Sequence, residues 1–180
     1  MLGKPKQLDA EALWRYALKV LGARSYSISE MRDRLNRRAE KADDAGAVLS
    51  RLKQYGYLND RQLAESYASA RMENQTQGRL RVVQDLRKKR VAPVVAEAAV
   101  REVYQDTDEA ALAEAFLSRK YRKVRLSEFL ADPKSLASAY RKLRLAGFTS
   151  GICLRVLKKF AREPEILERI EEGEERPPEE

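Results

Sequence analysis

The chain has 180 residues and a net charge of +8, with 43% apolar and 36% charged residues. This length and apolar content permit one ordinary core or several small ones. The single cysteine excludes an intrachain disulfide, and the absence of histidine removes the commonest general base and metal ligand. No stretch approaches the ~20 apolar residues that span a bilayer, and the start of the chain lacks an apolar signal core. We therefore expect a cytoplasmic protein with no membrane partner, no metal site and no cofactor.

A three-helix pattern recurs three times along the chain, over residues 8–58, 59–106 and 107–162. Each copy contains an amphipathic helix, a linker, a second helix with Leu near its end, and a third apolar helix after a short break. Only Pro93 and Pro133 interrupt this region, and both stand at a predicted helix start, where a missing N–H is tolerated. The predicted fold is all-α, a tandem repeat of three three-helix units that bury each other's faces.

Capping signals mark the helix starts of the first repeat most clearly. Asp9 is placed to cap the first helix, and Ser27 with Glu30 forms an S-x-x-E capping box for the second. Asn59 and Gln62 offer a similar box at the first helix of the second repeat. These signals predict the starts of the first, second and fourth helices.

The third repeat has a candidate cap before each of its three helices: Thr107, Asp132 and Thr149. Gly56 and Gly147 each follow an apolar helix, at the position where a left-handed residue most easily ends it. The sequence therefore predicts nine helices in all.

Positive charge is concentrated in the second and third repeats. Residues 79–90 (RLRVVQDLRKKR) contain six basic residues and one Asp, and residues 119–125 (RKYRKVR) contain five basic residues and no acid. Further basic clusters lie at 141–144 and 154–162. Residues 163–180, predicted as an acidic, disordered tail, contain nine Glu and two Arg, so they contribute −7 and the other 162 residues +15.

A body this basic favours an anionic partner, such as nucleic acid, an acidic protein surface or anionic lipid. A single basic cluster is usually a solvated helix face. Clusters at similar places in two repeats could instead align into one long positive track. Tyr121 lies within one cluster and could stack on a base, although a lone aromatic is more often part of a core.

Motifs that carry catalysis are missing. Neither G-x-x-x-x-G-K-[ST] nor G-x-G-x-x-G occurs among the eight glycines. Cys153 lies between Ile152 and Leu154, and we interpret it as a small core residue rather than a reactive thiol. The acidic pairs at 43–44 and 106–108 stand at helix starts, where capping is a better explanation than metal binding. The sequence therefore predicts a binding protein rather than an enzyme.

Three segments of the chain resemble the RecX family, which are bacterial regulators of the RecA recombinase. They are ALWRYALKVLGARSYSISEMRDRL, GYLNDRQLAESYASAR and GRLRVVQDLRKKRVAPVVAEAAV. The resemblance covers about residues 12–160. Its most specific part is the junction at which one repeat ends and the next begins, carried by Gly56, Tyr57, Leu58, Asp60, Leu63 and Ala64.

The chain departs from the family pattern at two positions. The family typically has Phe where this chain has Leu63, which is a mild change. It commonly has Lys-Gly-Ile or Lys-Gly-Val before the sixth helix, where this chain has Lys89, Arg90 and Val91. Arg90 must therefore occupy a position that suits glycine, so we expect a strained or altered turn there.

The resemblance implies an elongated, curved molecule that lies in the helical groove of the RecA–DNA filament. Such a protein inhibits or modulates RecA's recombinase, ATPase and co-protease activities, and so acts in DNA repair, homologous recombination and the SOS response. It also implies weak, non-specific binding to single- or double-stranded DNA. We expect a monomer. The residues predicted to contact DNA or the filament are Arg79, Arg81, Arg87, Lys88, Lys89, Arg90, Arg119, Lys120, Arg122, Lys123, Arg141, Arg144, Lys158 and Lys159.

Two other functions remain open from the sequence. The alternative is a general nucleic-acid-binding helical protein without a recombinase partner, although its positive charge is spread over several helices rather than focused on one recognition helix. An enzyme is disfavoured by the missing histidine and phosphate loops. Independently of these, the acidic residues 163–180 are hypothesised to fold over the basic track and weaken DNA binding.

Overall fold

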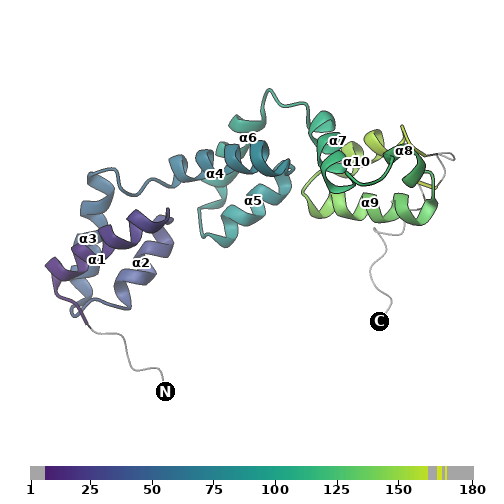
Figure 1. Cartoon of the computed structure of the whole chain (residues 1–180). Coiled ribbons are helices and arrows are strands. Elements are labelled where there is room, and N and C mark those ends of the chain that lie inside the picture. Colours follow the sequence, from purple (N-terminus) through teal and green to yellow (C-terminus); the bar gives the residue numbers. More distant parts are fainter. Residues whose placement is uncertain (1–6, 162–165, 168, 170–180) are drawn as a thin grey trace, which may run out of the picture. The chain divides into compact units, whose positions relative to one another are not determined.

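The chain folds into helices throughout the part that the structure describes. The computed structural model describes residues 7–161, 166, 167 and 169. Over these residues it contains ten helices, α1 to α10, and no strand beyond one isolated bridge between Leu8 and Ala39 (Figure 1). The predicted all-α class is confirmed. Most of the predicted acidic tail, 163–180, lies outside the described residues.

The helices assemble into two compact units. The N-terminal unit comprises the residues up to Tyr67 together with Asp85–Ala99, and the C-terminal unit comprises Ala68–Gln84 together with the residues from Val100 onward. The middle helices are α4 (Asp60–Gln75), α5 (Arg79–Lys88) and α6 (Pro93–Tyr104). One end of each belongs to the N-terminal unit and the other end to the C-terminal unit.

The N-terminal unit is built on α1 (Ala10–Ala23), α2 (Ile28–Asn36) and α3 (Ala42–Gln54). Its core contains fully buried Leu13, Met31, Leu35 and Leu52, and each such side chain stabilises the fold by about 1.5–3 kcal/mol. The predicted helix starts of this unit are confirmed. Asp9 Oδ1 accepts from the Ala12 N–H at 2.8 Å.

The capping box of α2 also ties this helix to the middle helices. Ser27 Oγ accepts from the Glu30 N–H, and the Glu30 carboxylate accepts from the Ser27 N–H, both at 3.1 Å. Ser27 is fully buried, and its hydroxyl donates to the Lys89 carbonyl at 2.5 Å. The next residue, Ile28, donates its N–H to Asp60 Oδ1 at 2.8 Å. The start of α2 is therefore fixed against both α4 and the turn after α5.

Three helices end in the same hydrogen-bonded turn. After α3, α5 and α9 (Pro133–Leu145), one N–H bonds back five residues and the preceding N–H bonds back three, which is a Schellman motif. The left-handed position is filled by Gly56, Arg90 and Gly147, with φ of 75°, 59° and 96°. Arg90 thus adopts the glycine-like conformation that the sequence indicated, which costs a residue with a side chain about 1–2 kcal/mol.

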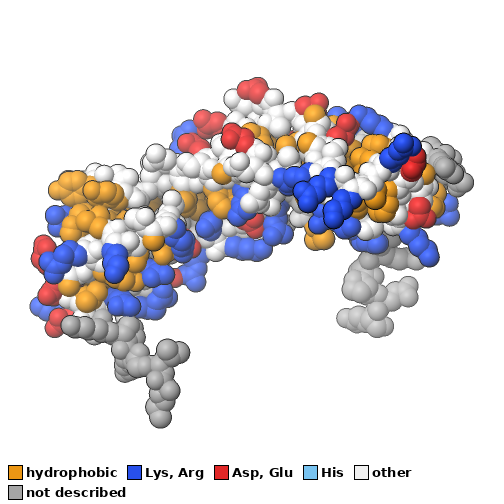
Figure 2. Space-filling view, viewed as in Figure 1, with side chains coloured by type: hydrophobic (Ala, Val, Ile, Leu, Met, Phe, Trp, Pro, Cys, Tyr) orange, Lys and Arg blue, Asp and Glu red, His pale blue; other side chains and the backbone are white. Residues whose placement is uncertain are grey.

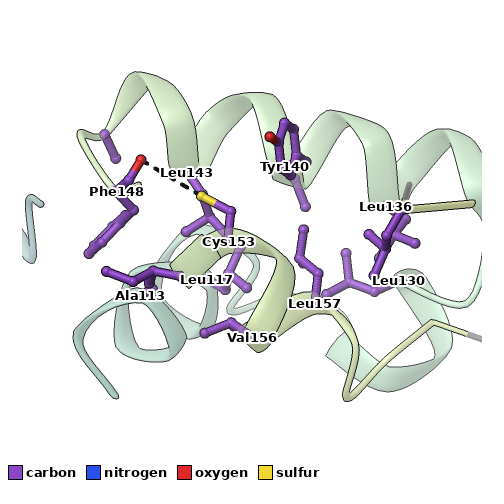
Figure 3. Packing of buried hydrophobic residues seen from close by; sticks show 14 residues of the cluster. Ala113, Leu117, Leu130, Leu136, Tyr140, Leu143, Phe148, Cys153, Val156 and Leu157 are labelled. Atoms are coloured by element: carbon purple, nitrogen blue, oxygen red, sulfur yellow. Dashed lines mark hydrogen bonds between the residues drawn. The ribbon is translucent and has the colours of Figure 1, made fainter. Parts of the chain in front are cut away.

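The C-terminal unit adds α7 (Glu109–Lys120), α8 (Leu126–Phe129), α9 and α10 (Ser150–Leu157). Its core contains Leu117, Leu143, Phe148 and the other residues of Figure 3. Cys153 is fully buried there and its Sγ lies 3.9 Å from the Phe148 carbonyl oxygen, so its interpretation as a core residue is confirmed.

Two predictions for the third repeat are wrong in detail. The four-residue α8 is an additional helix, so the described chain has ten helices rather than nine. The cap of α7 is Asp108 rather than Thr107, because the Asp108 carboxylate accepts from both the Ala110 and the Ala111 N–H. Asp132 caps α9 as predicted, and Thr149 occupies the cap position of α10 without a side-chain hydrogen bond.

The start of α5 meets the end of α9 through backbone alone. Gly78 donates its N–H to the Ala146 carbonyl at 2.9 Å, and Leu80 donates to the Gly147 carbonyl at 3.1 Å. A Cβ on Gly78 would overlap the Gly147 backbone, and a Cβ on Gly147 would overlap the Arg81 backbone. This glycine junction therefore holds α5 directly against α9 within the C-terminal unit.

Candidate nucleic-acid interface

The predicted binding residues of the second repeat lie at both ends of α5 and in the turn that follows it. Several of them form ion pairs, among them Arg79 with Glu109, Arg87 with Glu97, and Arg90 with Asp33. Each of these arginine side chains remains at least half exposed, and surface pairs of this kind contribute only about 0–1 kcal/mol. A phosphate group can therefore compete for the guanidinium groups of Arg87 and Arg90, whose acidic partners are also exposed, without a large loss of stability.

The Arg79–Glu109 pair differs from the other two because its carboxyl is largely buried. Burial raises the pKa of Glu109, and the positive charge of Arg79, 3.2 Å away, partly opposes this effect. Glu109 Oε2 is buried and has no hydrogen-bond partner among the described residues. Arg79 therefore neutralises a buried acid, which weakens its case as a phosphate ligand.

The remaining basic residues of α5 and of the turn after it differ in their exposure and in the groups that they contact. Lys88 is mostly exposed, and its Nζ lies 3.8 Å from Asp85 Oδ1. Lys89 is half-buried, and its Nζ lies 5.4 Å from the ring centroid of Tyr67. Arg81 is also half-buried, because its backbone lies against Gly147 at the junction with α9. Lys88 is thus the most accessible cation of this cluster.

Arg119 has a structural role that charge counting misses. Its guanidinium donates to the carbonyls of Asn74 and Gln75, the last residues of α4; the first of these bonds is 2.8 Å long. The last four carbonyls of a helix have no partner within the helix, so a side chain that reaches them acts as a cap. Arg119 therefore fixes the end of α4 against α7.

Five predicted residues are exposed and form no ion pair with any described residue: Lys120, Arg122, Lys123, Arg141 and Lys158. Three of them, Lys120, Arg122 and Lys123, surround a small hollow of about 220 Å³ at the end of α7. The ring of Tyr121 lies in this hollow, 4.8 Å from the ring of Phe129. This is the strongest concentration of uncompensated positive charge in the described part of the C-terminal unit.

Tyr121 is half-buried and packs at the edge of the core. Its hydroxyl accepts a hydrogen bond from Lys142 Nζ at 3.0 Å. These contacts agree with its interpretation as mainly a core residue.

Two basic residues of α9 line a hollow beside the glycine junction. Arg141 and Arg144 of α9 and Leu80 and Gln84 of α5 line a hollow of about 380 Å³. Arg144 also donates to the Phe148 carbonyl at 3.1 Å, while Lys159, after α10, is ion-paired with Glu114. The structure thus places Arg141 and Arg144 of α9 beside the start of α5, where the Arg81 backbone lies against Gly147, whereas Lys159 is engaged by Glu114.

Charge counting overlooked an aromatic surface in the N-terminal unit. Arginines stack there on aromatic rings: Arg24 on Tyr26, Arg38 on Tyr16 and Arg51 on Trp14, with guanidinium-to-centroid distances of 3.6, 4.8 and 4.1 Å. Two further rings, those of Tyr55 and Tyr57, are mostly exposed. Only the spacing of Tyr55 and Tyr57 around Gly56 was visible in the sequence, because Trp14 lies far away along the chain.

Comparison with known proteins places the chain in a family. A model of the second three-helix domain of RecX matches residues 59–100. Regulatory protein RecX of Pelodictyon phaeoclathratiforme is 30% identical over 142 residues, which cover 79% of this chain and 81% of that protein. The chain belongs to the RecX family. Regulatory protein RecX of Deinococcus radiodurans is likewise 30% identical, over 160 residues that cover 88% of this chain and 72% of that protein.

Solved RecX structures share the fold. The crystal structure of RecX from Lactobacillus salivarius superposes with a TM-score of 0.68 at 19% identity, over 84% of this chain and 96% of that one. A second crystal structure of regulatory protein RecX gives a TM-score of 0.66 at 18% identity, over 83% and 73%. The predicted resemblance is confirmed, and the name of these RecX relatives supports a regulatory role. No described helix is long and apolar enough to cross a membrane.

Proposed function

We propose that this RecX-family protein binds RecA filaments on DNA in their groove and inhibits or modulates recombinase, ATPase and co-protease activity. Through that activity it would regulate DNA repair, homologous recombination and the SOS response. The observation that best supports the proposal is the set of exposed cations without an ion-pair partner among the described residues, three of which surround the hollow at the end of α7. A filament presents phosphates and acidic protein surface repeatedly, so several modest contacts in series would give useful affinity.

The fourteen predicted basic residues are the candidates for this binding, although Arg79, Arg119 and Lys159 are engaged by other groups of the fold. Lys88, Lys120, Arg122, Lys123, Arg141 and Lys158 rank first, because each is exposed and at most weakly paired. Their role is to attract and position, since Lys and Arg contacts to phosphate carry no base information. The same chemistry predicts weak, non-specific binding to bare single- or double-stranded DNA, and we propose that the protein acts as a monomer.

Hydrolysis of ATP by RecA on single-stranded DNA tests the proposal. Adding the protein should lower the steady-state rate in a concentration-dependent manner. Its affinity for RecA-coated DNA should also exceed its affinity for the same DNA without RecA. Unchanged hydrolysis together with equal affinity for both DNA forms would instead support a general nucleic-acid-binding protein.

A further inference from the structure

An aromatic platform lies on the surface of the N-terminal unit, formed by Trp14 of α1 and by Tyr55 and Tyr57 at the end of α3. The ring centroids are 6.0 Å apart for Trp14–Tyr55, 6.2 Å for Trp14–Tyr57 and 6.5 Å for Tyr55–Tyr57. Tyr55 is 63% exposed and Tyr57 53% exposed. Figure 2 shows the corresponding apolar patch over the end of α3.

The local fold holds these rings outward. The left-handed Gly56 reverses the chain between the two tyrosines, and the Tyr57 N–H returns to the Leu52 carbonyl at 2.9 Å. Both rings are therefore set by a hydrogen-bonded turn, on the same side as Trp14. Two exposed rings held by a fixed backbone beside the half-buried Trp14 form an apolar surface patch of the kind that marks an interaction site.

The platform continues into a groove through Tyr57. This groove has a volume of about 910 Å³ and is lined by residues of α1, of the α1–α2 loop, of the α3–α4 segment and of α4, together with Lys89 after α5. Its floor and walls are aromatic, aliphatic and amide side chains, among them Tyr67, Leu63 and Gln62. Its only charged lining residues are Arg24 and Lys89, both positive.

The charged side chain that stacks on the platform, Arg51, is positive, as are the charged residues that line the groove. Arg51 lies over the ring of Trp14 at 4.1 Å and reaches Tyr55 at 5.8 Å. Arg24 forms an ion pair with Glu30, with 3.3 Å between Arg24 Nη2 and Glu30 Oε1. Glu30 itself does not line the groove. Exposed rings beside a groove whose only charged lining residues are positive are the combination that binds single-stranded nucleic acid, because its bases stack on the rings while its phosphates meet the cations.

We infer that the aromatic platform and its groove bind unpaired bases of single-stranded DNA, with Tyr55 and Tyr57 as stacking surfaces and Arg51 and Lys89 as phosphate contacts. A duplex keeps its bases stacked inside and cannot offer their faces to these rings. The site therefore favours a single strand, unlike the basic clusters, which attract any phosphate backbone. This inference does not rest on the proposed function, because it needs no RecA.

Trp14 is the only tryptophan of the chain, so its fluorescence reports on this platform alone. Titrating the full-length protein with an oligothymidylate should quench that fluorescence saturably, whereas a duplex should quench it much less. Tyr57→Ala or Tyr55→Ala should each weaken oligothymidylate binding about 5- to 100-fold, the range typical for loss of one base–aromatic stack. Tyr57→Phe, which keeps the ring, should bind within about twofold of the parent, since stacking uses the π-face.

Val94→Ala provides the matched control, because Val94 is an exposed apolar residue of the same unit that lines neither platform nor groove. It should bind normally. The tyrosine variants should keep the salt dependence of the parent, since stacking releases no counterions. An oligothymidylate that leaves Trp14 fluorescence unchanged, or alanine variants with normal affinity and normal helix content, would overturn the inference. Variants that bind the strand normally but no longer affect RecA would identify a protein contact instead.

Discussion

The two compact units use arginine and lysine in different ways. In the N-terminal unit several arginines stack on aromatic rings, as Arg24 does on Tyr26 and Arg51 on Trp14. In the C-terminal unit exposed cations such as Lys120 and Lys123 have no ion-pair partner among the described residues. The difference shows that counting positive charges does not locate a binding surface. The partners of each charge decide whether it stabilises the fold or remains available for phosphate.

The glycine junction should give the largest effect. Gly147→Ala puts a Cβ against the Arg81 backbone and forces an alanine to a φ of 96°, so it should destabilise the protein by about 3 kcal/mol or more. Thermal or urea unfolding measures this loss.

Gly46→Ala is the control for that change. Gly46 lies within α3 of the N-terminal unit, with open space around its Cβ position. Alanine there should stabilise the helix by up to about 1 kcal/mol. If Gly147→Ala and Gly46→Ala have the same free energy of unfolding, the close approach of α5 to α9 is contradicted.

Arg119 should behave as a helix cap rather than as a phosphate ligand. Arg119→Met removes the donors to the Asn74 and Gln75 carbonyls and should cost about 1 kcal/mol of stability. Lys120→Met, which removes one positive charge from an exposed neighbour, should leave the unfolding midpoint almost unchanged. Denaturant unfolding of the two variants separates these roles, and equal stability would instead support Arg119 as a proposed phosphate contact.

Arg90 tests how much strain the α5 turn contains. Arg90→Gly relieves the left-handed conformation but loses the exposed ion pair with Asp33, so a net gain below about 1 kcal/mol is expected. Arg90→Ala keeps the strain and also loses the pair, and should be less stable than the parent. An alanine variant as stable as the glycine variant would show that the turn is not strained.

Glu109 should give a small pH-dependent effect in the C-terminal unit. Its carboxyl has a raised pKa in the folded protein, so ionisation is harder in the fold than in the unfolded chain. The penalty is absent below the ordinary pKa of 4.5, grows as pH rises through the raised pKa, and is then constant. Stability of the parent relative to Glu109→Gln should therefore fall from acidic to neutral pH. If the stability of the parent relative to Glu109→Gln stays constant or rises with pH, the assigned burial of the Glu109 carboxyl is contradicted.

Helix starts and ends were predictable because their signals are local. Asp9, the Ser27–Glu30 box and Asp132 cap helices as predicted, since a cap needs only a carboxylate or hydroxyl a few residues from free N–H groups. Thr107 was a wrong choice because the adjacent Asp108 is equally placed and accepts two hydrogen bonds. Short α8 was missed because four residues carry too little periodicity to identify a helix.

The proposed binding surface was less predictable because the partners of its charged side chains are distant in sequence. Arg90 meets Asp33 across 57 positions, and Arg119 meets Asn74 across 45. Nothing in the basic clusters themselves distinguishes these engaged arginines from exposed Lys120 or Arg122. The aromatic platform was missed for the same reason, since only folding brings Trp14 to Tyr55 and Tyr57.

Charge reversal at the end of α7 tests the central claim most directly. In one variant, Glu replaces Lys120, Arg122 and Lys123. In the control variant, Glu replaces Arg32, Arg37 and Lys41, which are exposed residues of the N-terminal unit. Both variants change the net charge by the same amount. Both are compared with the parent in RecA-driven ATP hydrolysis on single-stranded DNA over a range of salt concentrations. The α7 variant should inhibit at least about tenfold less well and with a flatter salt dependence, by roughly one unit of slope per lost phosphate contact. The control should stay close to the parent, and an α7 variant that folds normally and inhibits RecA undiminished would contradict the account.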